Sequence, residues 1–252
     1  MIFIKAPAEI TRMRRSCQII ARLLDNLDAI IRPGVSTWEI DQYAESYIRE
    51  QGGKPSFKGY TVTGLPPFPG SVCASVNSVI VHGIPSKEVI LNEGDILGID
   101  VGVFCDGFHG DAARTYVIGS ISDEAKKLLD VTNTSLSIGI SMAVAGNRIG
   151  DISNAIGEYV SSNGMFVADN LTGHGIGREL HEAPQIPNFG VKGKGPRLVK
   201  GMTLAIEPMV NIGTNKVSEK GWEFSTADNS LSAHFEHTIL VTENQPEILT
   251  IV

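Results

Sequence analysis

The sequence is poor in cysteine, in long apolar runs and in excess positive charge. Its cysteines, Cys17, Cys73 and Cys105, are few and widely spaced, a pattern typical of free thiols in a reducing compartment. No apolar run approaches a membrane span, and the first residues carry too short an apolar stretch for a signal peptide. A net charge of −7 argues against nucleic acid as the main partner. We therefore expect a cytoplasmic protein that binds neither membranes nor nucleic acids.

The chain of 252 residues is long enough to bury a full hydrophobic core. Apolar residues that recur at spacings of three and four predict helices over 8–31, 37–50, 122–144 and 151–163. Short apolar runs between turn signals predict strands over 72–81, 96–100, 115–118 and 165–168, within 198–210, and over 238–241. No linker or low-complexity segment separates these elements, so we expect residues 1–252 to form a single domain.

Two aspartates flank a predicted β-hairpin. Asp100 ends one apolar run and Asp111 opens the next strand, while Asp106-Gly107 between them is a strong signal for a two-residue turn. Folding at this turn would place Asp100 and Asp111 on neighbouring strands, near the open end of the hairpin. Two carboxylates held together in an apolar setting repel each other unless one takes up a proton or a cation lies between them. Two hydrogen-bonded structural aspartates are the plainer alternative.

The second half of the chain repeats the first. Each half has a long helix, a break and a short helix, and residues 91–103 align with 198–210 without a gap. Two similar halves, roughly 8–120 and 121–252, predict a pseudo-two-fold arrangement with strands in the middle and helices outside.

This repeat predicts a site rich in carboxylates. In the alignment Asp100 falls on Glu207, and Asp111 and Glu236 each begin the strand that follows. Four such anions in one interior site need cations. His174, within the glycine-rich segment Thr172–Gly177, adds an imidazole nitrogen. Four oxygen donors, one nitrogen and no thiolate suit Mn, Fe(II), Co or Zn, and the number of ligands suits two ions about 3.5 to 4 Å apart.

The other histidines divide into two groups. His82 and His181 are predicted to donate a hydrogen bond to a substrate or a developing oxyanion, although a loop histidine bonded to the backbone is the alternative for each. His109, His234 and His237 are predicted to be structural. His237 follows Glu236 in a strand, so it is expected to point to the opposite face.

At these residues the sequence resembles the type I methionine aminopeptidases, from about residue 8 to its end. The matching motifs are Val81-His-Gly-Ile-Pro85, Ile99-Asp100, Gly107-Phe-His-Gly-Asp111, Thr172-Gly-His-Gly-Ile-Gly177, Ile206-Glu-Pro-Met-Val210 and Phe235-Glu-His-Thr238. The resemblance implies the pita-bread α/β fold, in which two pseudo-two-fold-related halves share a central, curved antiparallel sheet with helices outside. It also implies a pair of divalent metals held by Asp100, Asp111, His174, Glu207 and Glu236, with Asp111 and Glu236 bridging.

The resemblance further implies an activity. Members of the family remove the initiator methionine from nascent chains when the second residue is small, through a metal-bridging hydroxide that attacks the first peptide bond. His82 and His181 would contact the substrate, and Glu207 would help to move the proton of the water. Tyr60, Cys73 and Trp222 match positions that line the methionine pocket, where a thiol and aromatic rings suit a thioether; plain core packing is their alternative. The expected form is a monomer that acts on nascent polypeptides, with contact to the ribosome left open.

Some features depart from the family pattern. The loop Thr61–Pro67 is several residues longer than in many members, Phe68 stands where a tyrosine is frequent, and Leu180 replaces a frequent aromatic residue. The chain has neither a zinc-finger extension nor the insertion of type II enzymes, so the short bacterial-style form is expected. Two alternatives stay open: a proline-directed aminopeptidase or dipeptidase of the same fold, and a binding protein that keeps the fold without its metals.

Overall fold

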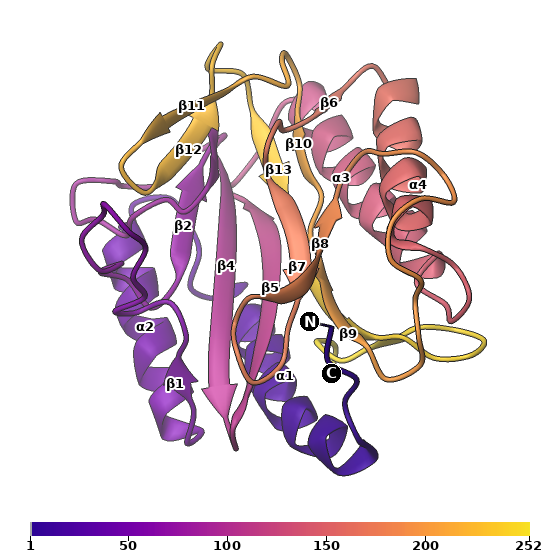
Figure 1. Ribbon diagram of the computed structural model, residues 1–252. Coiled ribbons are helices and arrows are strands. Elements are labelled where there is room, and N and C mark those ends of the chain that lie inside the picture. Colours follow the sequence, from indigo (N-terminus) through magenta and orange to yellow (C-terminus); the bar gives the residue numbers. More distant parts are fainter. Residues whose placement is uncertain (1) are drawn as a thin grey trace.

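Two pairs of helices cover the outside of the strands. In the computed structural model, which describes residues 2–252, the first half contributes α1 (Pro7–Leu27) and α2 (Thr37–Glu50), and the second contributes α3 (Asp123–Ser141) and α4 (Ile149–Ser162) (Figure 1). The long helix, break and short helix predicted for each half are confirmed. The first helix ends at Leu27 rather than at residue 31. The apolar pattern runs past the end of the helix because Ile31 also packs in the core, from the turn that follows. None of the helices in residues 2–252 is long and apolar enough to cross a membrane.

The start of α2 is set by its capping box, as predicted. The Ser36 side chain accepts a hydrogen bond from the Glu39 backbone N–H, and the Glu39 carboxylate accepts one from the Ser36 backbone N–H. The two bonds satisfy backbone donors that the first helical turn would otherwise leave unpaired.

A long hairpin forms the centre of the first half. Strands β4 (Ile96–Cys105) and β5 (Phe108–Val117) pair from Cys105 opposite Phe108 to Ile96 opposite Val117. The predicted turn is confirmed, since Asp106 and Gly107 both have positive φ, 52° and 86°, as a two-residue hairpin turn of this hand requires.

The predicted position of the two aspartates within this hairpin was wrong. Asp100 lies opposite Ala113 and Asp111 lies opposite Gly102, near the middle of the strands rather than at their open end. The pairing begins at Phe108 instead of Asp111, because Phe108 is fully buried and the strand order continues through His109 and Gly110.

Shorter strands complete the first half. β1 (Lys54–Pro55) and β2 (Cys73–Val76) flank β4, while β3 (Val79–Val81) leaves this sheet and pairs with β12 (Glu223–Thr226), which also pairs with β11 (Val217–Lys220). The single strand predicted over 72–81 is therefore two strands. Asn77, with φ 53°, turns the chain between them.

The second half holds two further antiparallel sheets. One has the order β15 (Glu247–Ile248), β14 (His237–Leu240), β9 (Thr203–Ile206), β7 (Thr172–Gly175) and β8 (Glu182–Pro187). The other has the order β13 (Ser232–His234), β10 (Met209–Asn211) and β6 (Phe166–Val167). Residues 198–210 thus contain β9 and the start of β10, with Glu207-Pro208 between the two strands.

Hydrogen bonds join the two halves along β5. The backbones of Ala113 and Glu236 exchange two hydrogen bonds, at 2.9 and 3.3 Å. The Thr238 hydroxyl accepts from the Asp111 backbone N–H and donates to the Asp111 carbonyl. A carboxylate of the first half, Asp111, is thereby fixed beside one of the second half, Glu236.

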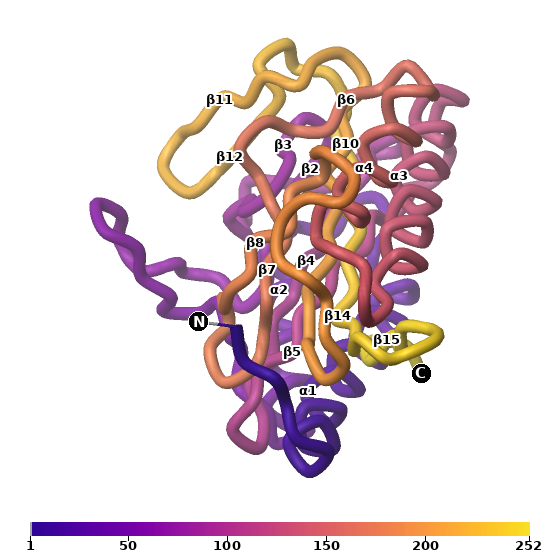
Figure 2. Tube along the Cα trace, turned by 45° about the vertical axis from the view of Figure 1, so that its right-hand side comes forward, coloured from indigo at the N-terminus to yellow at the C-terminus, as the bar shows by residue number. Residues whose placement is uncertain are grey.

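The N-terminal segment ties the halves together at a second place. It starts beside the second half, where Ile2 bridges to Ala183 and the Lys5 backbone N–H donates to the Gly201 carbonyl, and then runs into α1 of the first half (Figure 2).

Candidate metal centre and substrate pocket

One cavity of about 200 Å³ gathers all of the site residues predicted from the sequence. Those lining residues are Tyr60, Cys73, His82, Asp100, Asp111, His174, His181, Glu207, Trp222 and Glu236. They come from both halves of the chain, as the internal repeat predicts.

The acidic part of this cavity is built from positions within strands, Asp100, Asp111 and His174, and from positions directly between strands, Glu207 and Glu236. The His174 Nε2 atom lies 3.9 Å from Asp111 Oδ2 and 3.6 Å from Glu207 Oε1. Asp111, His174 and Glu236 each offer one ligand atom within 4.8 Å of the others. Asp100 completes the group from β4, beside the strand that carries Asp111.

His174 presents an unprotonated nitrogen to the carboxylates. Its Nδ1 lies 2.9 Å from the Gly175 carbonyl oxygen, and a carbonyl only accepts hydrogen bonds. The ring proton is therefore on Nδ1, which leaves the lone pair of Nε2 for a metal. A hydrogen bond of this kind is the usual way in which a ligating imidazole is oriented.

Several carboxyl oxygens of this cluster are buried and accept no hydrogen bond from the described residues. Asp100 Oδ1, Asp111 Oδ1 and Glu236 Oε1 are inaccessible to solvent and have no hydrogen-bond partner within residues 2–252. Burial raises the pKa of Asp100 to about 7 and that of Glu207 to about 8. It also raises the pKa values of Asp111 and Glu236 well above their usual range, and the neighbouring acids add to the effect.

This donor set fits a divalent metal site. The four carboxyls are buried or nearly so and repel one another, and three of them have an unpaired oxygen. Cations among them would stabilise them as anions. Burial lowers the pKa of His174 to about 3, so the imidazole stays neutral and can act as a ligand.

The rest of the cavity lining includes apolar and aromatic side chains. The Trp222 ring meets Phe68 edge to face at 5.5 Å between centroids, and its indole N–H donates to the Pro66 carbonyl at 2.9 Å. Cys73 lies opposite Asp100 in the pairing of β2 with β4. Burial, and then the charge of Asp100, raise the pKa of the Cys73 thiol, so the thiol stays neutral and forms a soft wall.

His82 and His181 border the acidic part of the cavity. His82 has φ 59°, an uncommon conformation for a residue other than glycine, and its Nδ1 is buried with no partner in the described chain. The His181 ring lies 4.4 Å from the His174 ring, and its Nδ1 lies 2.9 Å from the Tyr60 hydroxyl. Burial lowers the pKa of both histidines, that of His82 to about 4.

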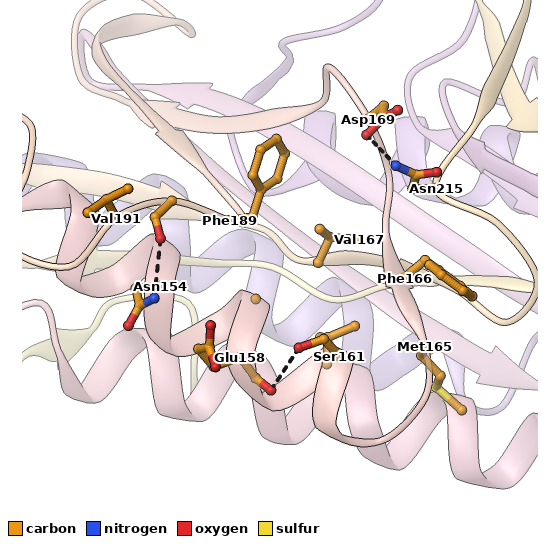
Figure 3. A pocket seen from close by; sticks show the side chains of 13 residues that line it. Asn154, Glu158, Ser161, Met165, Phe166, Val167, Asp169, Phe189, Val191 and Asn215 are labelled. Atoms are coloured by element: carbon orange, nitrogen blue, oxygen red, sulfur yellow. Dashed lines mark hydrogen bonds between the residues drawn. The ribbon is translucent and has the colours of Figure 1, made fainter.

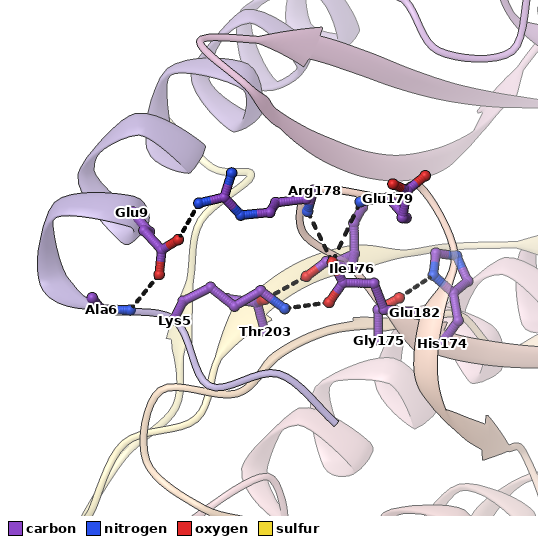
Figure 4. A network of polar contacts seen from close by, with 10 residues as sticks. All are labelled: Lys5, Ala6, Glu9, His174, Gly175, Ile176, Arg178, Glu179, Glu182 and Thr203. Carbon is purple, nitrogen blue, oxygen red and sulfur yellow. Dashed lines mark hydrogen bonds and ion pairs between the residues drawn. The ribbon is translucent and has the colours of Figure 1, made fainter. Parts of the chain in front are cut away.

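The N-terminal segment is attached to the loop that carries His181. Lys5 forms an ion pair with Glu182 in which both side chains are almost fully buried, 5% and 4% exposed. The second oxygen of the Glu182 carboxylate accepts from the backbone N–H groups of Arg178 and Glu179 (Figure 4). One buried carboxylate thus ties residues 5 and 178–182 together.

The three histidines predicted to be structural do not all lie away from the site. His109 bonds to Ser56, and His237 bonds to Thr250, away from Glu236 as predicted. His234, however, lies with Nε2 3.4 Å from Glu207 Oε2. The sequence signal that points to it is its spacing of two residues from Glu236, since residues two apart in extended chain share a face.

A larger cavity of about 520 Å³ lies elsewhere, between α4 and the segments 165–169 and 189–191 (Figure 3). Its two carboxylates are exposed to solvent or paired with polar side chains. Glu158 is exposed to solvent, and Asp169 bonds to Asn215 and Lys216. Among the described residues, the group of three side chains that offer ligand atoms within 4.8 Å of one another lies in the smaller cavity: Asp111, His174 and Glu236.

The chain belongs to metallopeptidase family M24, whose model matches residues 11–243. It is 48% identical to the methionine aminopeptidase of Clostridium acetobutylicum over 253 residues, which cover 100% of this chain and 99% of that protein. The crystal structure of methionine aminopeptidase from Thermotoga maritima matches all of this chain with a TM-score of 0.96 and 45% identity, and is itself covered completely. These matches confirm both the resemblance noted from the motifs and the expected pita-bread fold.

The prolidase from Pyrococcus furiosus shares the fold at greater distance. Its TM-score is 0.79 at 22% identity, and the match covers 99% of this chain but 65% of the prolidase. Identity at this level shows the fold alone. The proline-directed alternative is therefore not favoured.

Proposed function

We propose that this chain is a methionine aminopeptidase, which removes the N-terminal methionine from nascent proteins when the second residue is small. The strongest support is that one cavity of about 200 Å³ joins the buried acidic cluster to an apolar pocket. The near full-length similarity to methionine aminopeptidases supports the same activity.

Five lining residues would hold two divalent ions, with Asp111 and Glu236 contributing to both: Asp100, Asp111, His174, Glu207 and Glu236. Co, Mn, Fe(II) and Zn all accept such a set of carboxylates with one imidazole. When bound, these ions polarise a carbonyl group and make water a nucleophile near neutral pH.

The protein side chains would bind the substrate and move the proton. Glu207 would take and return the proton of the water, since its carboxylate lies within the cluster, with one oxygen 3.6 Å from His174 Nε2 and the other 3.4 Å from His234 Nε2. With the Tyr60 hydroxyl donating to Nδ1, His181 carries its proton on Nε2 and can donate to the peptide group of a substrate. His82, also neutral, would donate from the other side of the pocket.

Tyr60, Cys73 and Trp222 would enclose the methionine side chain. A thioether packs well against ring edges and other soft groups, and here the Trp222 ring and the neutral Cys73 thiol line the same cavity. Phe68 packs edge to face against Trp222 and lines the same cavity.

We also propose the setting in which the enzyme works. Residues 1–252 would form one metallopeptidase domain, active as a monomer in the cytoplasm on the N-termini of nascent polypeptides. The net charge of −7 supports a protein that does not bind RNA directly, so any contact with the ribosome would be through protein.

Release of the N-terminal residue from four peptides tests this proposal: Met-Ala-Ser, Met-Leu-Ser, Leu-Ala-Ser and Ala-Pro-Ser. Each is assayed with added Mn(II) or Co(II) and again with a chelator. Metal-dependent cleavage of Met-Ala-Ser alone is the expected result. Preference for Ala-Pro-Ser would instead assign the chain to the proline-directed branch, and no cleavage of any peptide by metal-loaded protein would contradict the proposed substrate.

A further inference from the structure

His234 is the one histidine near the acidic cluster that the proposed mechanism does not use. It lies at the end of β13, opposite Met209 in the pairing with β10. Because β10 begins two residues after Glu207, this pairing brings His234 beside Glu207. The side chain is 3% exposed and its Nε2 has no hydrogen-bond partner within residues 2–252.

The backbones on both sides of this contact are fixed. The Thr115 hydroxyl accepts from the His234 backbone N–H at 3.0 Å and donates to the His234 carbonyl at 2.8 Å. The Asn188 side chain donates to the Glu207 carbonyl at 2.9 Å. The approach of the two side chains is therefore set by the fold and does not depend on a flexible loop.

The Glu207 carboxylate lies between two imidazoles that meet different oxygens. His174 Nε2 is 3.6 Å from Oε1, and His234 Nε2 is 3.4 Å from Oε2. The two rings differ in what they offer. His174 Nε2 carries a lone pair, because its Nδ1 donates to Gly175. When Glu207 is ionised on binding metal, its carboxylate oxygens only accept, so His234 would offer Oε2 an N–H.

We propose that His234 is a positioning residue for Glu207: when metal is bound, its Nε2–H would close from the present 3.4 Å to hydrogen-bond distance of Oε2 and leave Oε1, on the side of His174, to bind metal. This inference rests on the proposed metal centre and assigns a role within it. A hydrogen bond to the oxygen that does not bind metal fixes the plane of the carboxylate, and losing such a contact typically lowers metal affinity about 10- to 100-fold.

Two variants separate positioning from other roles. His234→Leu keeps the approximate volume and removes the donor, whereas His234→Gln keeps an N–H at a similar reach. Calorimetric titration with Co(II) and the visible absorption spectrum of the Co(II)-loaded protein report on the site without any peptidase assay. His237→Gln is the matched control, since His237 bonds to Thr250 on the opposite face.

We expect His234→Leu to bind Co(II) about 10- to 100-fold more weakly than wild type and to shift its absorption bands. His234→Gln is expected to bind within about threefold of wild type, with an unchanged spectrum, as is His237→Gln. Thermal unfolding of each metal-free variant shows that the protein is folded.

Other patterns would overturn the inference. Equal affinity and spectrum in His234→Leu and wild type would make His234 merely structural. Equal losses in His234→Leu and His234→Gln would make it a direct metal ligand. Both patterns leave the proposed function intact. A wild-type protein that binds no Co(II) would instead remove the proposed function, and this inference with it.

Discussion

At the scale of single residues, the Tyr60 hydroxyl connects the apolar pocket to a predicted catalytic histidine, His181, through a hydrogen bond. Tyr60→Phe keeps the ring and removes the 2.9 Å contact with His181 Nδ1. One hydrogen bond contributes about 1 kcal/mol, so we expect kcat/KM for Met-Ala-Ser to fall about fivefold. Metal affinity is expected to stay unchanged. Steady-state kinetics with saturating Mn(II) measures the effect.

Tyr43→Phe is the control for this substitution, because Tyr43 lies on α2 and stacks with Tyr47, away from the cavity. It is expected to leave kcat/KM unaltered. An unchanged kcat/KM in Tyr60→Phe would show that His181 needs no partner for its orientation.

The contribution of His109 to folding stability can be measured through its dependence on pH. Burial lowers its pKa from the ordinary 6.5 to about 4. Between these values the unfolded chain binds a proton at this residue and the folded chain does not. Stability is therefore lost as the pH falls from 6.5 towards 4. We expect His109→Gln to lose less free energy of unfolding than wild type between pH 7 and pH 5, as measured by urea denaturation with chelator present.

The comparison of slopes makes this test specific. The buried carboxyls titrate alike in both proteins, so they cancel in the difference between wild type and His109→Gln. Parallel slopes would mean that His109 gains a proton in the folded state as readily as in the unfolded chain.

At the scale of elements, the N-terminal segment is held to the His181 loop by a buried ion pair. Lys5→Met leaves the Glu182 carboxylate, 4% exposed, without its cation. Breaking a buried pair on one side typically costs about 3 to 5 kcal/mol. We expect a loss of this size in the free energy of unfolding of Lys5→Met, measured by urea denaturation.

Two further variants define this effect. Lys200→Met removes an exposed pair with Glu243, 66% and 67% exposed, and is expected to cost less than about 1 kcal/mol. Lys5→Met combined with Glu182→Gln is expected to regain part of the loss, because the amide is neutral but still accepts from the Arg178 N–H. A double variant no more stable than Lys5→Met would attribute the loss to packing of the Lys5 chain.

Local sequence signals predicted the helices and turns well. The features that they did not predict depend on how the strands pair in the folded protein. The Asp106-Gly107 turn and the Ser36–Glu39 capping box are short-range chemistry and are confirmed. The position of Asp100 within the hairpin and the break at Asn77 depend on which strands lie alongside, which periodicity does not encode.

The site shows the same division. The repeat aligns Asp100 with Glu207 and so predicts that the carboxylates of the two halves meet, and they do line one cavity. The approach of His234 to Glu207 depends on the pairing of β13 with β10, a contact between segments that are not repeats of each other. In the sequence, only the spacing of His234 from Glu236 indicates it.

At the scale of the molecule, the metal-free protein brings together carboxyls whose ionisation opposes folding, which is why burial and mutual repulsion raise their pKa values. Carboxyls from both halves meet at the cavity, so a bound cation links the halves as well as serving the proposed reaction. An ion at 100 times its Kd stabilises the folded state by about 2.7 kcal/mol. For a chain of this length that is about 5 to 10 °C in Tm. Calorimetric melting with Mn(II) and with chelator is expected to differ by this amount.

Asp111→Asn separates the metal from the repulsion. The substitution keeps the shape of a side chain that is 3% exposed but removes one of the charges that raise the pKa of its neighbours. We therefore expect the metal-free variant to melt no lower than metal-free wild type, to gain little from Mn(II), and to lose turnover of Met-Ala-Ser. Near-normal turnover would refute the two-metal mechanism. Lower stability without metal would instead mean that the Asp111 carboxyl makes a net favourable contribution to the metal-free fold, since the hydrogen bonds between the backbone of residue 111 and Thr238 are retained in the variant.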